Sequence, residues 1–407
     1  MFWPSRPGRD VPAEVGDEER PDAAADRPVR SRALRLASRR PLLTVLGTGL
    51  LLLAAASGLL RIDVGQTLIR GLPEGEPARA AYVQASRGFA PGVLSPTVVL
   101  AEAPGIVARR PALRRLQSAI RALPGVALVV GPAQQPTDAN LGAVRSRSRD
   151  AVRFLVVFDA DPLGASGIRM LERLRARLPA LAAGAGLPDI ETSIAGDTAL
   201  AEETVRLTSD DLGRVAPAAL LAVFLVLAAF LRAAVAPLYL VAASVLALAA
   251  ALGLTVYVFQ DLLGYRELTY YVPFVAAVML VALGSDYNVF LTGRIWQEAR
   301  SRPLRDAVAV GGTRAAAAIT VAGIVLALSF ALLALVPVRP FRELAFAMSC
   351  GLLLDAFVVR TLFVPAVITL VGPASDWPGS RLRSSPPEPE PAGTLTARPA
   401  PGGSRNG

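Results

Sequence analysis

Hydrophobic residues along this chain collect in blocks long enough to cross a lipid bilayer, which takes ~20 apolar residues in a helix. The first block, Pro41–Leu60, stands alone and carries no charge. Further blocks follow closely after residue 212: Val215–Leu231, Pro237–Val258, Tyr271–Leu291, Ala315–Val336 and Leu344–Val371. The pattern predicts a polytopic α-helical membrane protein with six transmembrane helices, one at 41–60 and five within 213–372.

The stretch between the first block and the others, 61–212, has the mixed composition of a soluble domain. Alternating apolar positions predict strands, and apolar positions three to four apart predict amphipathic helices. The expected strands are Pro96–Glu102, Val126–Gly131, Val152–Phe158 and Asp189–Ala195, the expected helices Val107–Leu123 and Gly164–Leu181, and the expected loop Pro132–Arg149. This order predicts an extracytoplasmic α/β domain of the ferredoxin-like type, with no catalytic constellation in it.

The segment before the first block, 1–40, is rich in Pro, Arg, Asp and Glu without apolar periodicity, which predicts a disordered tail. Between residues 27 and 40 it holds six arginines and no acidic residue. Positive charge beside a span favours the cytoplasmic side, so this tail is expected to be cytoplasmic. A cleaved signal peptide is the alternative, but the long polar start and long apolar run favour a retained anchor helix.

The remaining charges fit the same topology. The stretch Arg294–Arg314 between two predicted spans is rich in arginine and is expected in the cytoplasm, whereas Arg339 and Arg342 fall on the outer side. The end of the chain, 373–407, is rich in Pro, Ser and Gly and is predicted to be a second disordered cytoplasmic tail.

Composition supports a membrane protein and narrows its chemistry. The chain is 53% hydrophobic, with a mean hydropathy of +0.46 and a net charge of +9. Its basic residues are all arginines that cluster beside apolar segments, which argues against a nucleic-acid partner. There is no histidine and a single cysteine, Cys350, and no phosphate-binding loop of the Walker type. We therefore expect no metal site, no cofactor and no enzymatic activity, and proton chemistry must use carboxylates, tyrosine, arginine and water.

Asp286 is the main candidate for such chemistry. It lies in VMLVALGSDYNVFLTGR, where a carboxylate costs ~3 kcal/mol to insert and usually marks an ion or proton pathway. Tyr287 and Asn288 follow it and offer hydroxyl and amide partners. The structural alternative is an aspartate that only bonds a neighbouring helix.

Asp355 and Arg360 form a second candidate pair in the last span, GLLLDAFVVRTLFVPAV. Residues five apart lie about 140° apart on an α-helix, so the two side chains are not expected to meet directly. We consider a proton relay and a structural ion pair with a loop or another helix, and favour the structural pair.

Three segments give the chain a resemblance to the MMPL family of the resistance-nodulation-division (RND) superfamily. These segments are GSDYNVFLTGRIWQEAR, AITVAGIVLALSF and GLLLDAFVVRTLFVPAVITLVG. The resemblance implies proton-driven export of lipids or other hydrophobic molecules across a bacterial cell membrane. It implies that Asp286 and Tyr287 form the proton relay, and that 61–212 is a porter domain.

The resemblance also implies a partner. Family members have two halves, and the Asp of one meets the Tyr of the other, whereas this sequence shows one half, most like the second. We expect a second half-transporter, either another copy or a separate half-protein, unless the chain is an incomplete remnant. Because sterol-sensing bundles are similar, a non-transporting lipid-binding or accessory membrane subunit is the alternative, and a protein-export aid of the same superfamily is a third.

Overall fold

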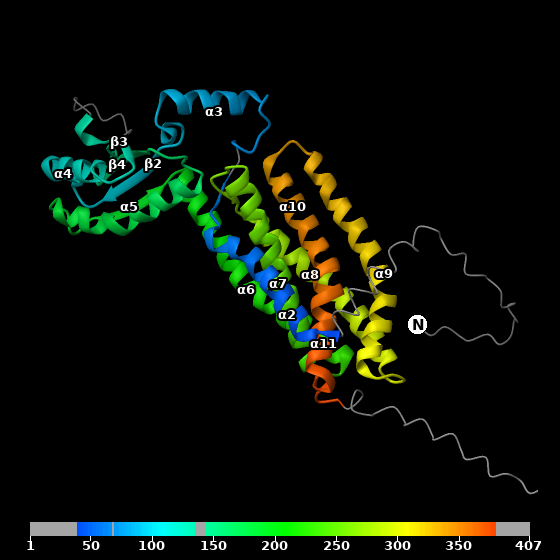
Figure 1. Ribbon diagram of the computed structural model, residues 1–407. Coiled ribbons are helices and arrows are strands. Elements are labelled where there is room, and N and C mark those ends of the chain that lie inside the picture. Colours follow the sequence, from blue (N-terminus) through cyan, green and yellow to red (C-terminus); the bar gives the residue numbers. More distant parts are fainter. Residues whose placement is uncertain (1–38, 67–68, 135–143, 380–407) are drawn as a thin grey trace, which may run out of the picture.

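The computed structural model describes residues 39–66, 69–134 and 144–379. The tails predicted to be disordered lie outside the described residues, apart from their inner ends. Figure 1 shows a bundle of long helices with a small α/β domain projecting from one end, here called the domain end.

Six helices in the described part of the chain are long and apolar enough to cross a membrane. They are formed by α2 (Pro41–Ala56), α6 (Asp197–Leu231), α7 (Val235–Val256), α8 (Tyr271–Glu298), α9 (Leu304–Ala331) and a last span of three segments, α10 (Arg339–Leu353), a π-helix (Leu354–Phe363) and α11 (Val364–Val371). The six predicted spans are confirmed.

The helices extend beyond the apolar blocks. Helix α6 begins at Asp197, as expected for a helix that leads towards the membrane, and runs through the apolar block from Val215 into the bundle without a break. The charged stretch expected as a loop is mostly helical, because α8 continues to Glu298 and α9 begins at Leu304. Hydropathy marks where a helix enters lipid, whereas arginine, glutamate and glutamine are good helix formers that prolong it in water.

The α/β domain holds one four-stranded sheet. Its elements are β2 (Thr97–Glu102), α4 (Arg110–Arg121), β3 (Val126–Val130), β4 (Ala151–Phe158), α5 (Ala165–Gly184) and β5 (Glu191–Ala195). The strand order is β3-β4-β2-β5 with every neighbouring pair antiparallel, so β2 and β3, joined through α4, are separated by β4. The sheet buries Val99 and Phe154 against Leu116 of α4 and Leu171 of α5.

Two features at the domain end were not predicted. Helix α3 (Pro77–Gly88) lies across this end of the bundle (Figure 1). Strand β1 (Val64–Gly65), just after the first span, pairs in parallel with β6 (Leu268–Thr269), just before α8. The backbone N–H of Arg339 also donates to the carbonyl of Gly71 at 2.9 Å, so three segments distant in sequence are joined here.

The prediction of disorder from residue 373 is wrong for its first residues. A 3-10 turn, Gly372–Asp376, follows α11, and Ser375 and Asp376 are fully buried. The Ala234 N–H before α7 donates to the carbonyl of Trp377 at 2.7 Å.

Candidate proton-coupling site in the bundle

The sequence candidates on α8 point in three directions, since successive helical residues turn by 100°. Asn288 is buried inside the bundle, Tyr287 is half-buried, and Asp286 is exposed on the surface of this chain. An aspartate in a membrane span usually faces the interior of the bundle. In this structure Asn288, two residues after Asp286, occupies the interior position instead. Asp286 therefore lies on the outer surface of the bundle.

Arg360 organises the buried side of this site. It is 2% exposed, and its Nε and Nη2 lie 2.7 Å from Oδ2 of Asp355. Nη1 donates to Oδ1 of Asn288 at 3.0 Å, and Nη2 donates to the carbonyl of Gly284 at 2.6 Å. The guanidinium carbon is 5.2 Å from the centre of the Tyr287 ring, within range of a cation–π contact.

The expectation that Asp355 and Arg360 do not meet is wrong, and the reason is local backbone geometry. Both residues lie in the π-helix Leu354–Phe363. A π-helix hydrogen-bonds residue i to i+5, so residues five apart come close on one face. Pro365, just beyond this segment, has no backbone N–H to donate to the carbonyl four residues earlier, as a regular α-helix requires. The structural interpretation was a pair with a loop or another helix, but the pair forms inside the last span and bonds α8 as well.

A third helix joins the network through a residue that the sequence did not single out. The Nδ2 of Asn288 donates to Oγ of Ser244 on α7 at 3.2 Å, and Ser244 donates to the Leu240 carbonyl at 3.1 Å. A serine amid apolar residues gives little signal, since such hydroxyls commonly bond their own helix. The network fixes α7, α8 and the last span to one another and leaves Asn288 with both amide atoms engaged.

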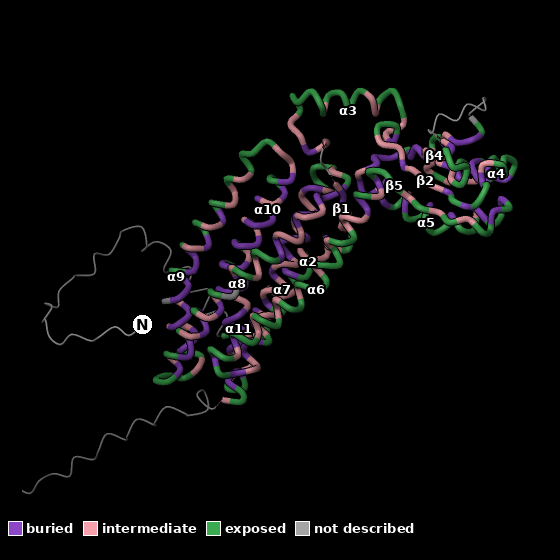
Figure 2. Tube along the Cα trace, turned by 180° about the vertical axis from the view of Figure 1, so that it is seen from behind, coloured by how far each residue is buried: buried purple, intermediate pink, exposed green. Residues whose placement is uncertain are grey.

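The exposed side of the site adjoins a shallow groove on α9. The groove has a volume of about 680 Å³ and is lined by Tyr287 and by small or apolar residues: Ala317, Ala318, Val321, Ala322, Val325, Leu326 and Ser329. Val321 is 60% exposed, and exposed positions run along α9 at the edge of the bundle (Figure 2). Small side chains allow another helix to approach closely within a membrane. This surface can accept a helix beside Asp286 and Tyr287.

Comparison with known proteins places this architecture in a family. The profile of the MMPL family matches residues 72–391. The membrane protein ActII-3 of Streptomyces coelicolor is 30% identical over 393 residues, 96% of this chain and 50% of that protein. The apo-petrobactin exporter of Bacillus anthracis is 28% identical over 349 residues, 85% of this chain and 45% of that protein.

A further relative is similar over a shorter range. The sulfolipid-1 exporter MmpL8 of Mycobacterium tuberculosis is 35% identical over 237 residues, 57% of this chain and 21% of that protein. The chain spans about half the length of the longest-matching relatives. The family profile covers most of the six-helix bundle and the α/β domain, including the Asp286–Tyr287 pair and the ion pair of the last span. The chain therefore belongs to the MMPL family.

Proposed function

We propose that this protein exports lipids or other hydrophobic molecules across the bacterial cell membrane, driven by the proton gradient. Asp286 takes up and releases the proton, and Tyr287 is its hydroxyl neighbour on the path. The observation that carries the proposal is the exposed carboxylate of Asp286 in a span of 28 residues with few charges. A carboxylate facing lipid costs ~3 kcal/mol, a cost that a functional role explains.

The same exposure supports pairing with a second half. A second bundle packed against the α9 groove removes Asp286 from lipid and brings a partner hydroxyl to it, while its own aspartate approaches Tyr287. The groove beside Tyr287 is apolar and built of small side chains, as close helix contacts in membranes require. The second half is another copy of this chain or a separate half-protein.

Asp355 and Arg360 serve a structural role in this proposal. Arg360 already makes four polar contacts with Asp355, Asn288 and Gly284, so it is committed to holding the last span against α8. Its position over the ring of Tyr287 keeps that ring at the surface of the bundle. Arg360 is thus a positioning residue for the Asp286–Tyr287 pair.

The α/β domain is assigned as an extracytoplasmic porter domain of the ferredoxin-like type. Its strand order supports this, because two strand–helix–strand units interleave in one antiparallel sheet. The opposite end of the bundle carries Arg294, Arg300, Arg302 and Arg305 where α8 and α9 meet. Positive residues favour the cytoplasmic side, which supports cytoplasmic chain ends and an extracytoplasmic α/β domain.

The names of two relatives support a role in export. One is named for a sulfolipid and another for apo-petrobactin. Transporter relatives and the lack of a catalytic constellation in the sequence both argue for transport over catalysis.

The test replaces the chromosomal copy with Asp286→Asn in the native host and measures accumulation of a hydrophobic fluorescent dye. We expect accumulation to rise to the level seen when a protonophore collapses the proton gradient. The matched control is Asp306→Asn, which removes an exposed carboxylate in the first turn of α9 and keeps wild-type export. Normal export by an Asp286→Asn protein present at wild-type level would sink the proposal and favour a lipid-binding accessory role.

A further inference from the structure

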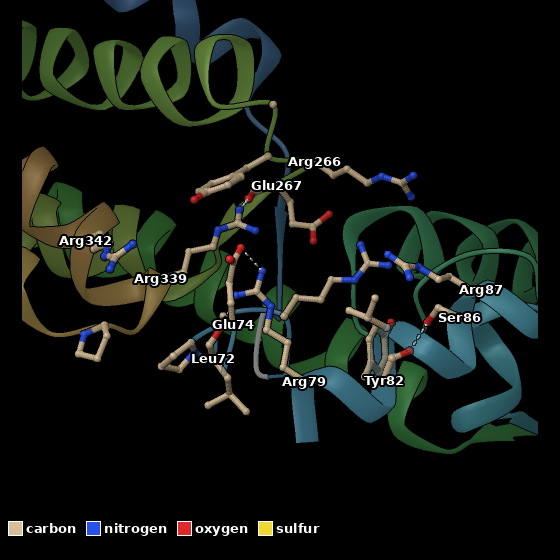
Figure 3. Close-up of a pocket in the computed structure, with 17 residues that line it drawn as sticks. Leu72, Glu74, Arg79, Tyr82, Ser86, Arg87, Arg266, Glu267, Arg339 and Arg342 are labelled. Carbon is tan, nitrogen blue, oxygen red and sulfur yellow. Dashed lines mark hydrogen bonds and ion pairs between the residues drawn. The ribbon is translucent and has the colours of Figure 1, made fainter. Parts of the chain in front are cut away.

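A large hollow opens at the domain end of the bundle, away from Asp286. It has a volume of about 730 Å³ and is lined by α3 and the segment before it, by the loop before α8, and by the start of α10. Figure 3 shows arginines from all three segments around this hollow, here called the arginine hollow. Six arginines line it against two glutamates: Arg70, Arg79, Arg87, Arg266, Arg339 and Arg342 against Glu74 and Glu267.

Three of the six arginines have acidic partners. Nε of Arg70 lies 2.8 Å from Asp161, Nε of Arg339 lies 2.7 Å from Glu343, and Nη2 of Arg79 lies 3.5 Å from Glu74. Arg339 also packs over the ring of Tyr265, with 4.0 Å from its guanidinium carbon to the ring centre. These arginines build the wall of the hollow.

The other three, Arg87, Arg266 and Arg342, are exposed, and within the described ranges none forms an ion pair with an acidic side chain. Glu267 is 2% exposed, and burial raises its pKa against the influence of Arg339 and Arg70. Planar guanidinium groups bind phosphate, sulfate and carboxylate oxygens through paired charge-assisted hydrogen bonds. The hollow therefore has an excess of positive charge at its surface and is suited to an anion.

A second hollow of about 450 Å³ adjoins the first and shares Arg70 and Tyr82 with it. Its walls are mainly apolar, from α3 and the segments packed beneath it: Ile69, Ala78, Ala81, Ala85, Leu94, Pro162 and Leu163. Its two acidic residues are engaged, Asp161 with Arg70 and Asp197 with the hydroxyl of Ser95. This apolar hollow is suited to a hydrocarbon group.

Tyr82 stands where the two hollows meet. Its side chain is 8% exposed, and its buried hydroxyl lies close to Asp161 and Arg70. Burial raises the pKa of Tyr82 to about 12, so the hydroxyl keeps its proton and remains a donor at neutral pH.

The arginine hollow also lies beside a surface suited to lipid. Leu335, Val336 and Phe341 are exposed apolar residues that flank Pro337, Arg339 and Arg342 in the connection from α9 to α10. An amphiphile at the edge of the bilayer can place its head group against the arginines of the first hollow and its hydrocarbon chain in the apolar hollow.

We propose that the two hollows form one binding site for an anionic amphiphile, a molecule with a phosphate, sulfate or carboxylate head and a hydrocarbon chain. The head binds Arg87, Arg266 and Arg342, and the chain enters the apolar hollow past Arg70 and Tyr82. Only the identification of this amphiphile as the exported cargo rests on the proposed function. Binding itself requires neither a proton gradient nor Asp286.

The experiment measures binding to the purified full chain in nonionic detergent, using radiolabelled phosphatidylglycerol and phosphatidylcholine of equal chain length. Inorganic phosphate is the competitor that carries the head chemistry without the chain. The head variant is the triple Arg87→Gln, Arg266→Gln and Arg342→Gln. Its matched control is the triple Arg114→Gln, Arg121→Gln and Arg147→Gln, three exposed arginines on the α/β domain. The chain variant is Ala85→Trp, which fills the apolar hollow.

We expect phosphatidylglycerol to bind at least about tenfold tighter than phosphatidylcholine, and the head variant to lose that preference, as the loss of one or two charge-assisted hydrogen bonds implies. The control triple keeps it, and Ala85→Trp weakens both lipids. Equal binding of the two lipids, or full preference in the head variant, would overturn the anionic head. Displacement by phosphate at the lipid's own concentration would overturn the role of the chain. Asp286→Asn keeps binding, so failure here is distinct from failure of proton coupling.

Discussion

Two clusters of arginine in this protein show how one side chain serves opposite purposes. In the middle of the bundle, Arg360 is buried and bonded to Asp355, Asn288 and Gly284. At the domain end, Arg87 and Arg266 are exposed and without acidic partners among the described residues. The first arginine is satisfied by the protein and holds helices together. The second group has hydrogen bonds left to offer, and this distinguishes a binding surface from a structural pair.

Removing Arg360 from its buried network is expected to have the largest effect on stability. Arg360→Ala leaves the Asp355 carboxylate buried without its cation, which costs about 3–5 kcal/mol of the free energy of unfolding. Thermal unfolding of the purified protein in detergent measures the loss.

The companion variant Asp355→Leu with Arg360→Met replaces both charges by apolar groups of similar volume. It is expected to recover most of the stability, because a buried pair costs desolvation on both sides. Arg266→Gln is the matched control and changes stability by less than about 0.5 kcal/mol, as surface substitutions do. If Arg360→Ala were no less stable than Arg266→Gln, the contrast between the two clusters would fail.

Glu267 combines features of both sites, because it is a buried acid that lines the arginine hollow. Burial and the nearby Asp161 carboxylate raise the pKa of Glu267 from 4.5, against the opposing influence of Arg339, Arg70 and the Ala165 N–H. Between that reference value and the raised pKa, the folded state binds more protons than the unfolded state, so stability falls as pH rises. Below pH 4.5 both states are protonated and the penalty is absent.

Glu267→Gln removes this penalty. The variant is expected to gain stability relative to wild type as pH rises from 4.5 towards 7, by the typical size of a single substitution, about 1 kcal/mol. Thermal midpoints of both proteins across that range give the difference. A constant difference at every pH would show that the pKa of Glu267 is the same in the folded and unfolded states, contrary to this account.

The smallest effect on stability is expected for Asp286→Asn, despite its proposed part in transport. Asp286 lies on the apolar surface of the bundle, and the substitution removes a carboxylate from it, so we expect no large loss in the free energy of unfolding. Asp355→Asn in the same assay is expected to be clearly less stable because it disturbs the contact with Arg360. Equal losses in the two variants would mean that both aspartates are structural.

Much of the membrane architecture follows from the sequence, because a span must be long and apolar whatever surrounds it. Which face of α8 is inside does not follow, since lipid and protein interior both favour apolar residues and no periodicity separates Asp286 from Asn288. The contact of Asp355 with Arg360 was missed because a π-helix leaves no signal in residue type. Helix α3 had signals, Pro77 at its start and Gly88 at its end, that a search for apolar periodicity passes over.

The arginine hollow could not be predicted at all, because its wall joins segments from three distant parts of the chain. Arg339 and Arg342 looked like exceptions to the positive-inside rule. In the structure Arg339 is paired with Glu343 and Arg342 borders the hollow, so each has a local reason to be there.

Helix α8 has a mechanical consequence that neither cluster shows alone. It begins two residues after β6 and carries Asp286 fifteen residues along, about 22 Å away at 1.5 Å per residue. The strand pair β1–β6 ties its beginning to the chain that leads into α3. If α8 tilts when the charge at Asp286 changes, the first residues of the helix move. The loop before α8, which lines the arginine hollow, moves with them.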